Sequence, residues 1–126
     1  MAIILILEQE FNLANGLKAM LEKEGYGVLT DFSFLHPDGL GDAPKPDLII
    51  INIDVPKEFG LSILRKAKDD FPGVPLIAMS VYSHSFSKNE ISRLGVDDFV
   101  AKPFEVEQLK KRVEELIIRK DKIIKS

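Results

Sequence analysis

The 126-residue chain contains no cysteine, and its two histidines stand alone in the sequence. The missing thiols exclude disulfides, thiolate nucleophiles and cysteine-bound metals. His36 and His84 have no second histidine at a metal-ligand spacing, so we expect both in solvated loops. Gly-rich phosphate loops, dinucleotide-binding motifs and nucleophile elbows are missing as well. The chain carries none of these enzyme signatures, and we expect no enzyme.

Long hydrophobic runs are also missing. The opening segment AIILIL is apolar but short, and it continues directly into Glu8. A buried strand explains this segment better than a signal peptide or a membrane span. We therefore expect no membrane segment and a cytoplasmic location.

Charge of one sign is not in large excess, because the formal net charge is −3. Such a charge gives no general attraction to nucleic acid. Seven basic and three acidic residues lie between Lys110 and Lys125. We interpret this local excess as the solvated face of a terminal helix and its tail rather than as a nucleic-acid arm.

The length and composition predict one domain with a sizeable core. Hydrophobic residues make up 45% and charged residues 29% of the chain, which is ordinary for a globular protein. We place the domain at residues 1–119 and interpret residues 120–126 as a C-terminal tail or linker stub.

Short apolar runs recur along the chain without the alternation that is typical of half-buried strands. They span Ile3 to Leu7, Tyr26 to Leu29, Leu48 to Ile53, Leu76 to Met79 and Phe99 to Ala101. Runs of this kind predict strands that are buried on both faces of a parallel sheet.

Segments with helical spacing of apolar residues lie between these runs. They span Phe11 to Glu24, Phe59 to Phe71, Phe86 to Leu94 and Glu105 to about Lys120. The alternation predicts an α/β fold with a doubly wound parallel sheet and helices on both faces. Only residues 31–46 are unclear, because their prolines and glycines allow no more than a short or irregular helix.

Polar residues follow several of the predicted strands. In open α/β sheets, ligands bind beyond the carboxyl ends of the strands, where the strand order reverses. The residues that this rule brings together are Glu8, Gln9, Glu10, Asn52, Asp54, Ser80 and Lys102.

Several stretches, in this order, resemble the receiver domain of response regulators of the chemotaxis-protein type. They are LILEQE, GYGV, PDLIIINIDVP, FGLSILR, PLIAMS and GVDDFVAKPF, followed by a basic amphipathic last helix. The most specific piece is Lys102-Pro103-Phe104 with Gly95 and Asp97-Asp98 before it. The resemblance implies a flavodoxin-like sheet of five strands in the order 2-1-3-4-5 and a role in two-component signal transduction by phosphorelay.

The resemblance also implies a phosphorylation switch. In this family, an aspartate at the end of the third strand attacks a phosphohistidine, and an acidic pair after the first strand holds Mg²⁺. A lysine and a serine or threonine bind the phosphoryl oxygens. The matching positions here are Asn52 for the phosphoacceptor, Glu8 and Gln9 for the acidic pair, and Ser80 and Lys102 for the phosphate-binding residues.

The two amides at these positions predict the loss of the family's chemistry. An amide oxygen is neutral and an amide nitrogen has a delocalised lone pair, so Asn52 cannot form an acyl phosphate. Gln9 and Asn52 together remove two formal charges from the metal shell and leave Glu8, so we expect weak or absent Mg²⁺ binding and no other cofactor. Lys102 then pairs with Glu8 or Asp54 and hydrogen-bonds the Asn52 amide, as a lock in place of a switch.

Further positions follow from the same resemblance. Phe99 matches the aromatic switch residue and, without a hydroxyl group, is expected to pack inward. Asp97, Asp98 and Arg112 match charged positions through which some receivers dimerise, so a homodimer through this face is an open alternative.

We interpret the chain as an atypical receiver, or pseudo-receiver, that acts by protein–protein interaction without aspartyl phosphorylation. The expected partner is a signalling protein, namely a histidine kinase, an output domain or another regulator. Three alternatives stay open: the altered pocket binds a small ligand, Asp54 is a residual phosphoacceptor, or the basic tail binds nucleic acid.

Overall fold

The computed structural model describes residues 1–31, 45–54, 57–81 and 85–125, with side chains up to residue 119. The predicted short or irregular helix between residues 31 and 46 falls almost wholly outside the described residues. The predicted loop positions of His36 and His84 fall outside them as well.

Five parallel strands form one sheet in the order β2-β1-β3-β4-β5. They are β1 (Ile3–Leu7), β2 (Gly27–Asp31), β3 (Leu48–Asn52), β4 (Leu76–Ser80) and β5 (Asp98–Ala101). This confirms the predicted fold class and strand order. Because β2 lies on one side of β1 and all later strands on the other, the winding direction reverses between β1 and β3.

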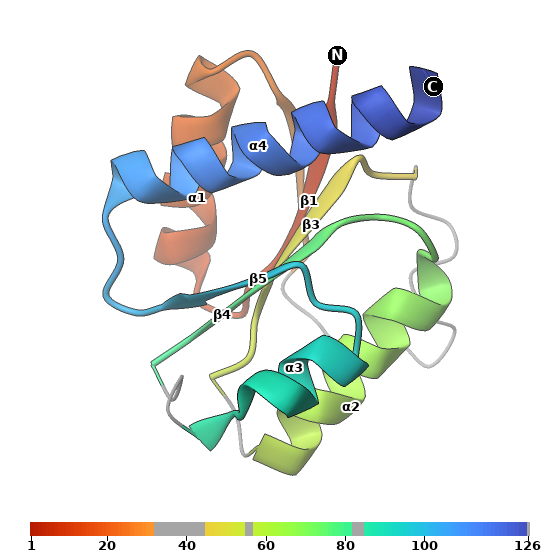
Figure 1. The fold of residues 1–126 in the computed structure, drawn as a ribbon. Helices are drawn as coiled ribbons and strands as arrows, with labels where there is room; N and C mark the ends of the chain where they lie inside the picture. Colours follow the sequence, from red (N-terminus) through yellow and green to blue (C-terminus); the bar gives the residue numbers. More distant parts are fainter. Residues whose placement is uncertain (32–44, 55–56, 82–84, 126) are drawn as a thin grey trace.

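Four helices of the described residues cover the two faces of this sheet. They are α1 (Phe11–Lys23), α2 (Lys57–Asp70), α3 (Lys88–Arg93) and α4 (Val106–Lys125). Helices α1 and α4 lie over one face, and α2 and α3 lie over the other (Figure 1). None of the helices in the described part of the chain is long and apolar enough to cross a membrane.

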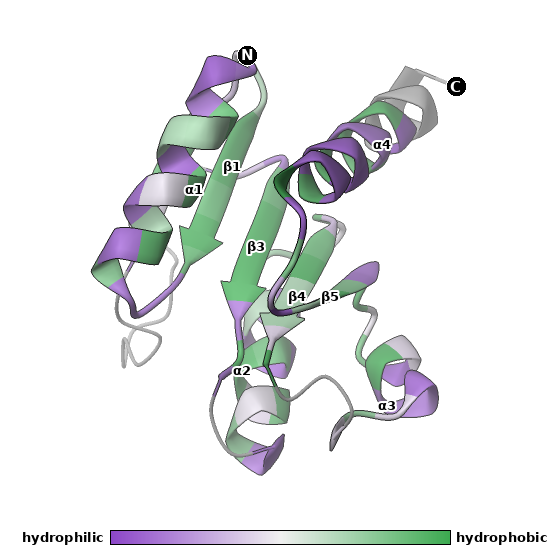
Figure 2. Ribbon diagram, turned by 90° about the vertical axis from the view of Figure 1, so that its left-hand side faces the viewer, coloured by the Kyte–Doolittle hydropathy of each residue, from purple (hydrophilic) through white to green (hydrophobic). Residues whose placement is uncertain are grey.

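The core consists of two apolar layers, one on each face of the sheet. Successive residues of a strand point to opposite faces, so Ile50 joins the cluster under α1 and α4 while Ile51 joins the cluster under α2 and α3. Both side chains are essentially inaccessible to solvent. Figure 2 shows the result as almost uniformly hydrophobic central strands. Double-sided burial is the physical reason for the unbroken apolar runs in the sequence.

The helix boundaries differ from the prediction by more than one residue in three places. Helix α2 begins at Lys57, two residues before the predicted Phe59. Helix α3 begins only at Lys88, because the Ser87 side chain and the Glu90 side chain form a reciprocal capping box at its start. Helix α4 continues beyond Lys120 to Lys125, through the predicted boundary of the tail. The division of the chain after residue 119 stays a prediction.

Substitutions of the two adjacent central-strand residues test the two-layer core. Ile50→Ala and Ile51→Ala each create a cavity in a different layer, and each is expected to lower the free energy of unfolding by about 2–5 kcal/mol. Ile118→Ala, at a position 44% exposed on α4, is the matched control and is expected to change it by at most about 0.5 kcal/mol. Urea unfolding measures all three; a loss in only one of the two strand variants would contradict a sheet covered on both faces.

Candidate functional site

All three buried polar residues of the described chain lie at the carboxyl edge of the sheet. Glu8 directly follows β1, Asn52 ends β3 and Ser80 ends β4, and these residues are 2%, 7% and 0% exposed. Lys102 follows β5, and its side chain is 11% exposed. The structure thus brings together residues that the positions after the strands had marked as a candidate site.

Backbone hydrogen bonds hold these positions in place beyond the strands themselves. The Ile53 N–H donates to the Met79 carbonyl at 2.9 Å, and the Lys102 N–H donates to the Ser80 carbonyl at 3.0 Å. The ends of β3, β4 and β5 are therefore fixed relative to one another by the main chain. The side chains of the site project from a preformed edge.

The ammonium group of Lys102 lies at the centre of the site. Its Nζ donates hydrogen bonds to Asn52 Oδ1 and to Asp54 Oδ2, both at 2.8 Å, and lies 3.6 Å from Glu8 Oε2. The predicted contact with the Asn52 amide is present. Of the two carboxylates between which the sequence did not decide, Asp54 is the hydrogen-bonded partner and Glu8 is a more distant ionic neighbour.

Glu8 is a buried carboxylate with only one well-bonded oxygen. Its Oε1 accepts from Asn52 Nδ2 at 3.2 Å and from the Glu10 N–H at 3.0 Å, whereas the buried Oε2 accepts no hydrogen bond. Burial raises the pKa of Glu8, and the Glu10 N–H and the charge of Lys102 oppose this shift only in part. The net direction is upward because desolvation outweighs the compensating contacts.

Asp54 has the opposite electrostatic balance. Its Oδ1 accepts from the Val81 N–H at 2.7 Å, and its Oδ2 accepts from Lys102. Burial alone would raise the pKa of Asp54, but the hydrogen bonds from Lys102 and Val81 outweigh it and lower the pKa. Asp54 therefore carries its negative charge at neutral pH.

The two residues after Glu8 do not add charge to the site. Gln9 is exposed and neutral. Glu10 caps helix α1, because its carboxylate oxygens accept from the N–H groups of Asn12 and Leu13 at 3.1 and 2.6 Å. Glu10 was predicted at the site, but in the structure its side chain caps helix α1.

The donor set does not fit Mg²⁺. This ion requires an octahedral shell of hard oxygen ligands, mostly anionic. Here the Asn52 and Asp54 oxygens that face the site are hydrogen-bonded to the Lys102 ammonium, and Glu8 is the remaining carboxylate. Within the described ranges, no group of three or more histidine, aspartate or glutamate side chains is arranged to hold a metal ion.

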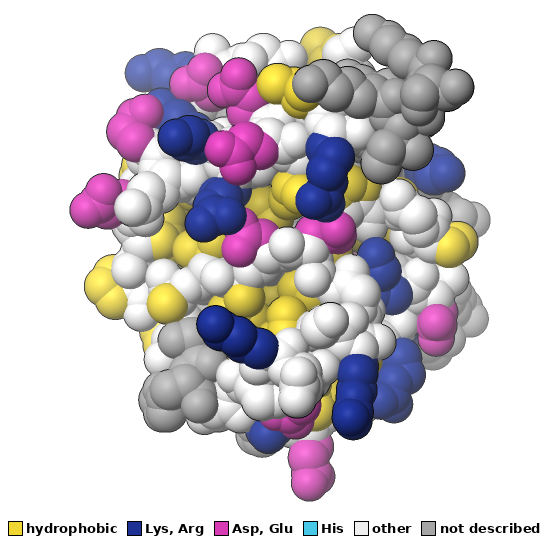
Figure 3. Space-filling model, in the orientation of Figure 1, with side chains coloured by type: hydrophobic (Ala, Val, Ile, Leu, Met, Phe, Trp, Pro, Cys, Tyr) yellow, Lys and Arg dark blue, Asp and Glu magenta, His cyan; other side chains and the backbone are white. Residues whose placement is uncertain are grey.

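Phe99 lies beside the site on the face covered by α2 and α3. Its ring is half-buried, packs against the apolar cluster of that face and lies 5.4 Å from the ring of Phe86 at an angle of 43°. The two rings, with Ile91 and Val96, line a groove of about 490 Å³ between α3 and β5. Figure 3 shows apolar side chains exposed between α4 and α3, bordered by side chains of both charges.

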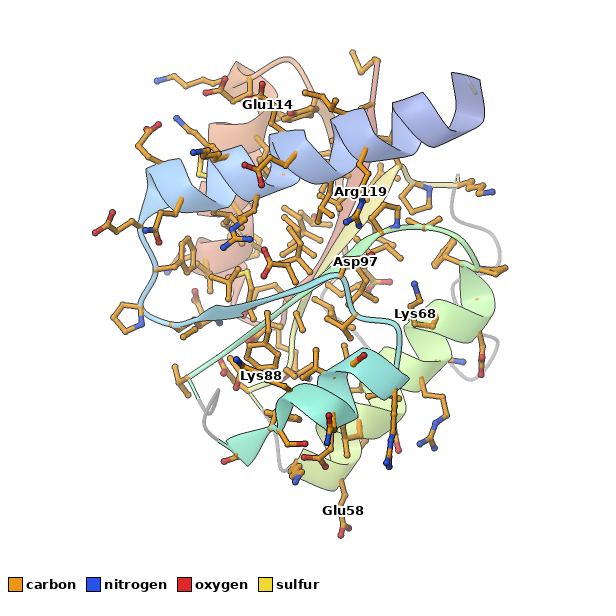
Figure 4. The ribbon with its side chains drawn as sticks, viewed as in Figure 1. Glu58, Lys68, Lys88, Asp97, Glu114 and Arg119 are labelled. Carbon is orange, nitrogen blue, oxygen red and sulfur yellow. The ribbon has the colours of Figure 1, made fainter. Side chains whose placement is uncertain are left out.

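The charged residues that matched a dimerisation face pair within the chain. Asp98 Oδ2 lies 3.2 Å from Arg112 Nη1, and Asp97 Oδ1 accepts from Arg119 Nη2 at 3.0 Å. Figure 4 shows Arg119 reaching from α4 toward Asp97. The sequence did not predict that Arg119 pairs with Asp97, because this contact depends on how α4 crosses the sheet. These exposed pairs contribute little each, and a homodimer through this face stays a prediction.

Removing the central cation tests how much the site depends on it. Lys102→Met leaves the Asp54 and Glu8 carboxylates without their cation, and is expected to lower the free energy of unfolding by about 3–5 kcal/mol. Lys66→Met is the matched control, because Lys66 pairs with Asp70 at 3.9 Å on an exposed helix face; its expected loss is at most about 0.5 kcal/mol. Equal losses in the two variants, measured by urea unfolding, would contradict a central role for Lys102.

The raised pKa of Glu8 predicts a pH-dependent stability difference. Because this pKa is higher in the folded than in the unfolded state, the folded state binds more protons, and Glu8 lowers stability as the pH rises above its ordinary value of 4.5. Glu8→Gln removes this effect, so its melting temperature relative to the parent should rise between pH 4 and pH 7. Glu115→Gln, at an exposed position of α4, should show no such trend. A Glu8→Gln difference that shrinks with rising pH would show that the sign is wrong.

Comparisons with known proteins place this geometry in a family. The sequence profile of the response regulator receiver domain matches residues 4–114. The response regulator ArlR of Staphylococcus aureus is 36% identical over 118 residues, which cover 92% of this chain and 52% of ArlR. The transcriptional regulatory protein DltR of Streptococcus agalactiae is 33% identical over 112 residues, which cover 87% of this chain and 49% of DltR. The chain spans about half the length of these curated relatives.

Solved structures agree with this assignment. The response regulator protein TrrA from Thermotoga maritima, solved in complex with Mg(2+)-BeF, superposes with a TM-score of 0.76 at 27% identity and covers 92% of this chain and 99% of that one. A response regulator receiver domain protein from Clostridium thermocellum has a TM-score of 0.82 at 24% identity over 98% and 99% of the two chains, which shows the shared fold. The chain belongs to the response regulator receiver domain family, whose members are signalling modules of two-component systems.

Proposed function

We propose that this receiver is a pseudo-receiver, a protein-interaction module of two-component signalling that works without aspartyl phosphorylation. The observation that supports the proposal is the state of the acceptor position. Asn52 receives a hydrogen bond from Lys102 on its Oδ1 and donates one from its Nδ2 to Glu8. The amide is thus engaged on both sides and buried, and it has no anionic oxygen with which to attack phosphorus.

The proposal includes weak or absent Mg²⁺ binding and no other cofactor. The ammonium of Lys102 supplies the positive charge around which the site's oxygens gather, and Gln9 and Asn52 supply no anionic ligand. A divalent cation would have to displace this ammonium and strip its own water shell for a single free carboxylate. That exchange is unfavourable for an ion that dehydrates reluctantly.

Signalling would then proceed by docking. We propose that the partner is a histidine kinase, an output domain or another regulator in the cytoplasm, and that it contacts the surface between the end of β4 and the start of α4. The apolar groove between α3 and β5 supports this choice, because the Phe99 ring and the side chains of Ile91 and Val96 are partly exposed there. Lys88 and Asp97 border the groove with opposite charges. Apolar anchors with a charged rim are typical of protein interfaces.

Acetyl phosphate tests the loss of phosphorylation directly. Incubation with acetyl phosphate and Mg²⁺ should leave the intact mass of the parent protein unchanged. The double variant Gln9→Asp/Asn52→Asp restores both missing carboxylates and should gain one phosphoryl group, whereas Asn52→Asp alone should gain less because its metal shell stays incomplete.

The same experiment distinguishes a residual acceptor at Asp54. The hydrogen bonds on both of its oxygens stabilise its charge and make it a weaker nucleophile. Asp54→Asn, like the parent protein, should therefore gain no phosphoryl group. A phosphoryl group that the parent protein gains and the Asp54→Asn variant loses would overturn the proposed function and identify Asp54 as the acceptor.

A further inference from the structure

Two hydrogen-bond donors at the carboxyl edge of the sheet converge on one carboxylate. The Val81 N–H donates to Asp54 Oδ1 at 2.7 Å, and the Lys102 ammonium donates to Asp54 Oδ2 at 2.8 Å. The donors come from the ends of β4 and β5, whereas Asp54 comes from the segment after β3.

This donor set has the chemistry of an oxyanion site. A backbone N–H and an ammonium that point to one place bind anions strongly, because charge-assisted hydrogen bonds are short and add to one another. The set is not specific for a carboxylate, since the oxygens of a phosphate ion meet the same two donors. The Asp54 side chain is 23% exposed, so the site opens to solvent on one side.

The donors are held independently of Asp54. The main-chain bond from Lys102 N–H to the Ser80 carbonyl joins the ends of β4 and β5, and the one from Ile53 N–H to the Met79 carbonyl joins β3 to β4. The Lys102 ammonium also keeps its hydrogen bond to Asn52 Oδ1. Removal of the Asp54 side chain therefore leaves a preformed anion site with its ligand missing.

We propose that Asp54 is a built-in ligand of this oxyanion site, and that its carboxylate occupies the place that a free phosphate ion takes when the side chain is removed. Anion binding at this place does not depend on the proposed function, but its role in regulation rests on the proposed loss of phosphorylation at Asn52. With Asp54 in place, the ends of β3, β4 and β5 are held permanently around an anion. The receiver then needs no phosphoryl group to keep these contacts, and external phosphate does not change them.

Titration of Asp54→Ala with inorganic phosphate tests the proposal, with sodium chloride at equal ionic strength as the reference. The amide proton of Val81, followed by ¹H–¹⁵N NMR, should move upfield when its carboxylate acceptor is removed and return downfield as phosphate saturates the site. The melting temperature of the variant should rise with phosphate along the same saturation curve. The parent protein and Asp69→Ala, which removes an exposed carboxylate from α2, should show neither response.

A second variant identifies the site of binding. Adding Lys102→Met to Asp54→Ala removes the charged donor and should weaken phosphate binding about tenfold or more. Asp54→Ser, whose shorter side chain also frees the place of the carboxylate, is titrated in the same way if Asp54→Ala does not fold. The proposal is overturned if the folded variant shows no saturable response, or if the parent protein responds equally well.

The phosphate titration of Asp54→Ala and the acetyl phosphate experiment on the parent protein can fail independently of each other. Inorganic phosphate is not a phosphoryl donor, so its binding leaves the intact mass unchanged after dialysis. A covalent gain of mass with acetyl phosphate would contradict the proposed function without affecting the phosphate titration of Asp54→Ala, and a missing titration response would leave the mass result as it stands.

Discussion

The hydrogen bonds of the Lys102 ammonium join the end of β5 to the end of β3, and its charge lies near Glu8 at the end of β1. An ammonium on a side chain that is only 11% exposed needs partners, and it finds them in Asn52 Oδ1, Asp54 Oδ2 and the more distant Glu8. Two properties of the site follow from this arrangement. The Asn52 and Asp54 oxygens face the ammonium, and the segment after β3 is tied to the end of β5.

The pKa values of the two carboxylates around this cation shift in opposite directions because their hydrogen bonds differ. Both oxygens of Asp54 accept hydrogen bonds, so its pKa falls although the group is partly buried. Glu8 leaves one buried oxygen without a hydrogen bond, and burial therefore raises its pKa. Asp54 is thus the hydrogen-bonded counter-ion of Lys102, and Glu8 is a more distant ionic neighbour. This is why the proposed built-in anion is Asp54, whereas Glu8 serves mainly to orient the Asn52 amide.

Local patterns in the sequence predicted the sheet well, because strands buried on both faces leave unbroken apolar runs; β1, at Ile3–Leu7, matches its run residue for residue. The helix ends were less predictable, as the capping box that delays α3 competes with apolar spacing that begins at Phe86. The candidate site was predictable as a set of residues. The sequence did not predict that Lys102 hydrogen-bonds Asp54 and not Glu8. This outcome depends on small differences in distance, and on the Val81 N–H, a backbone donor to Asp54 that no side-chain motif reveals.

A receiver fold with a hydrogen-bonded amide at the end of β3 can still present a defined surface to a partner. The central claim is that Lys102 is bound to Asp54 and Asn52 and that this arrangement excludes Mg²⁺. The most direct measurement is the ¹⁵N NMR signal of the Lys102 ammonium during a Mg²⁺ titration. The predicted result is a slowly exchanging ammonium, coupled to the Asp54 carboxylate, whose signal Mg²⁺ leaves unchanged. A solvent-averaged lysine signal, with Glu8 and Asp54 carboxyl carbons that shift and saturate with Mg²⁺, would contradict it.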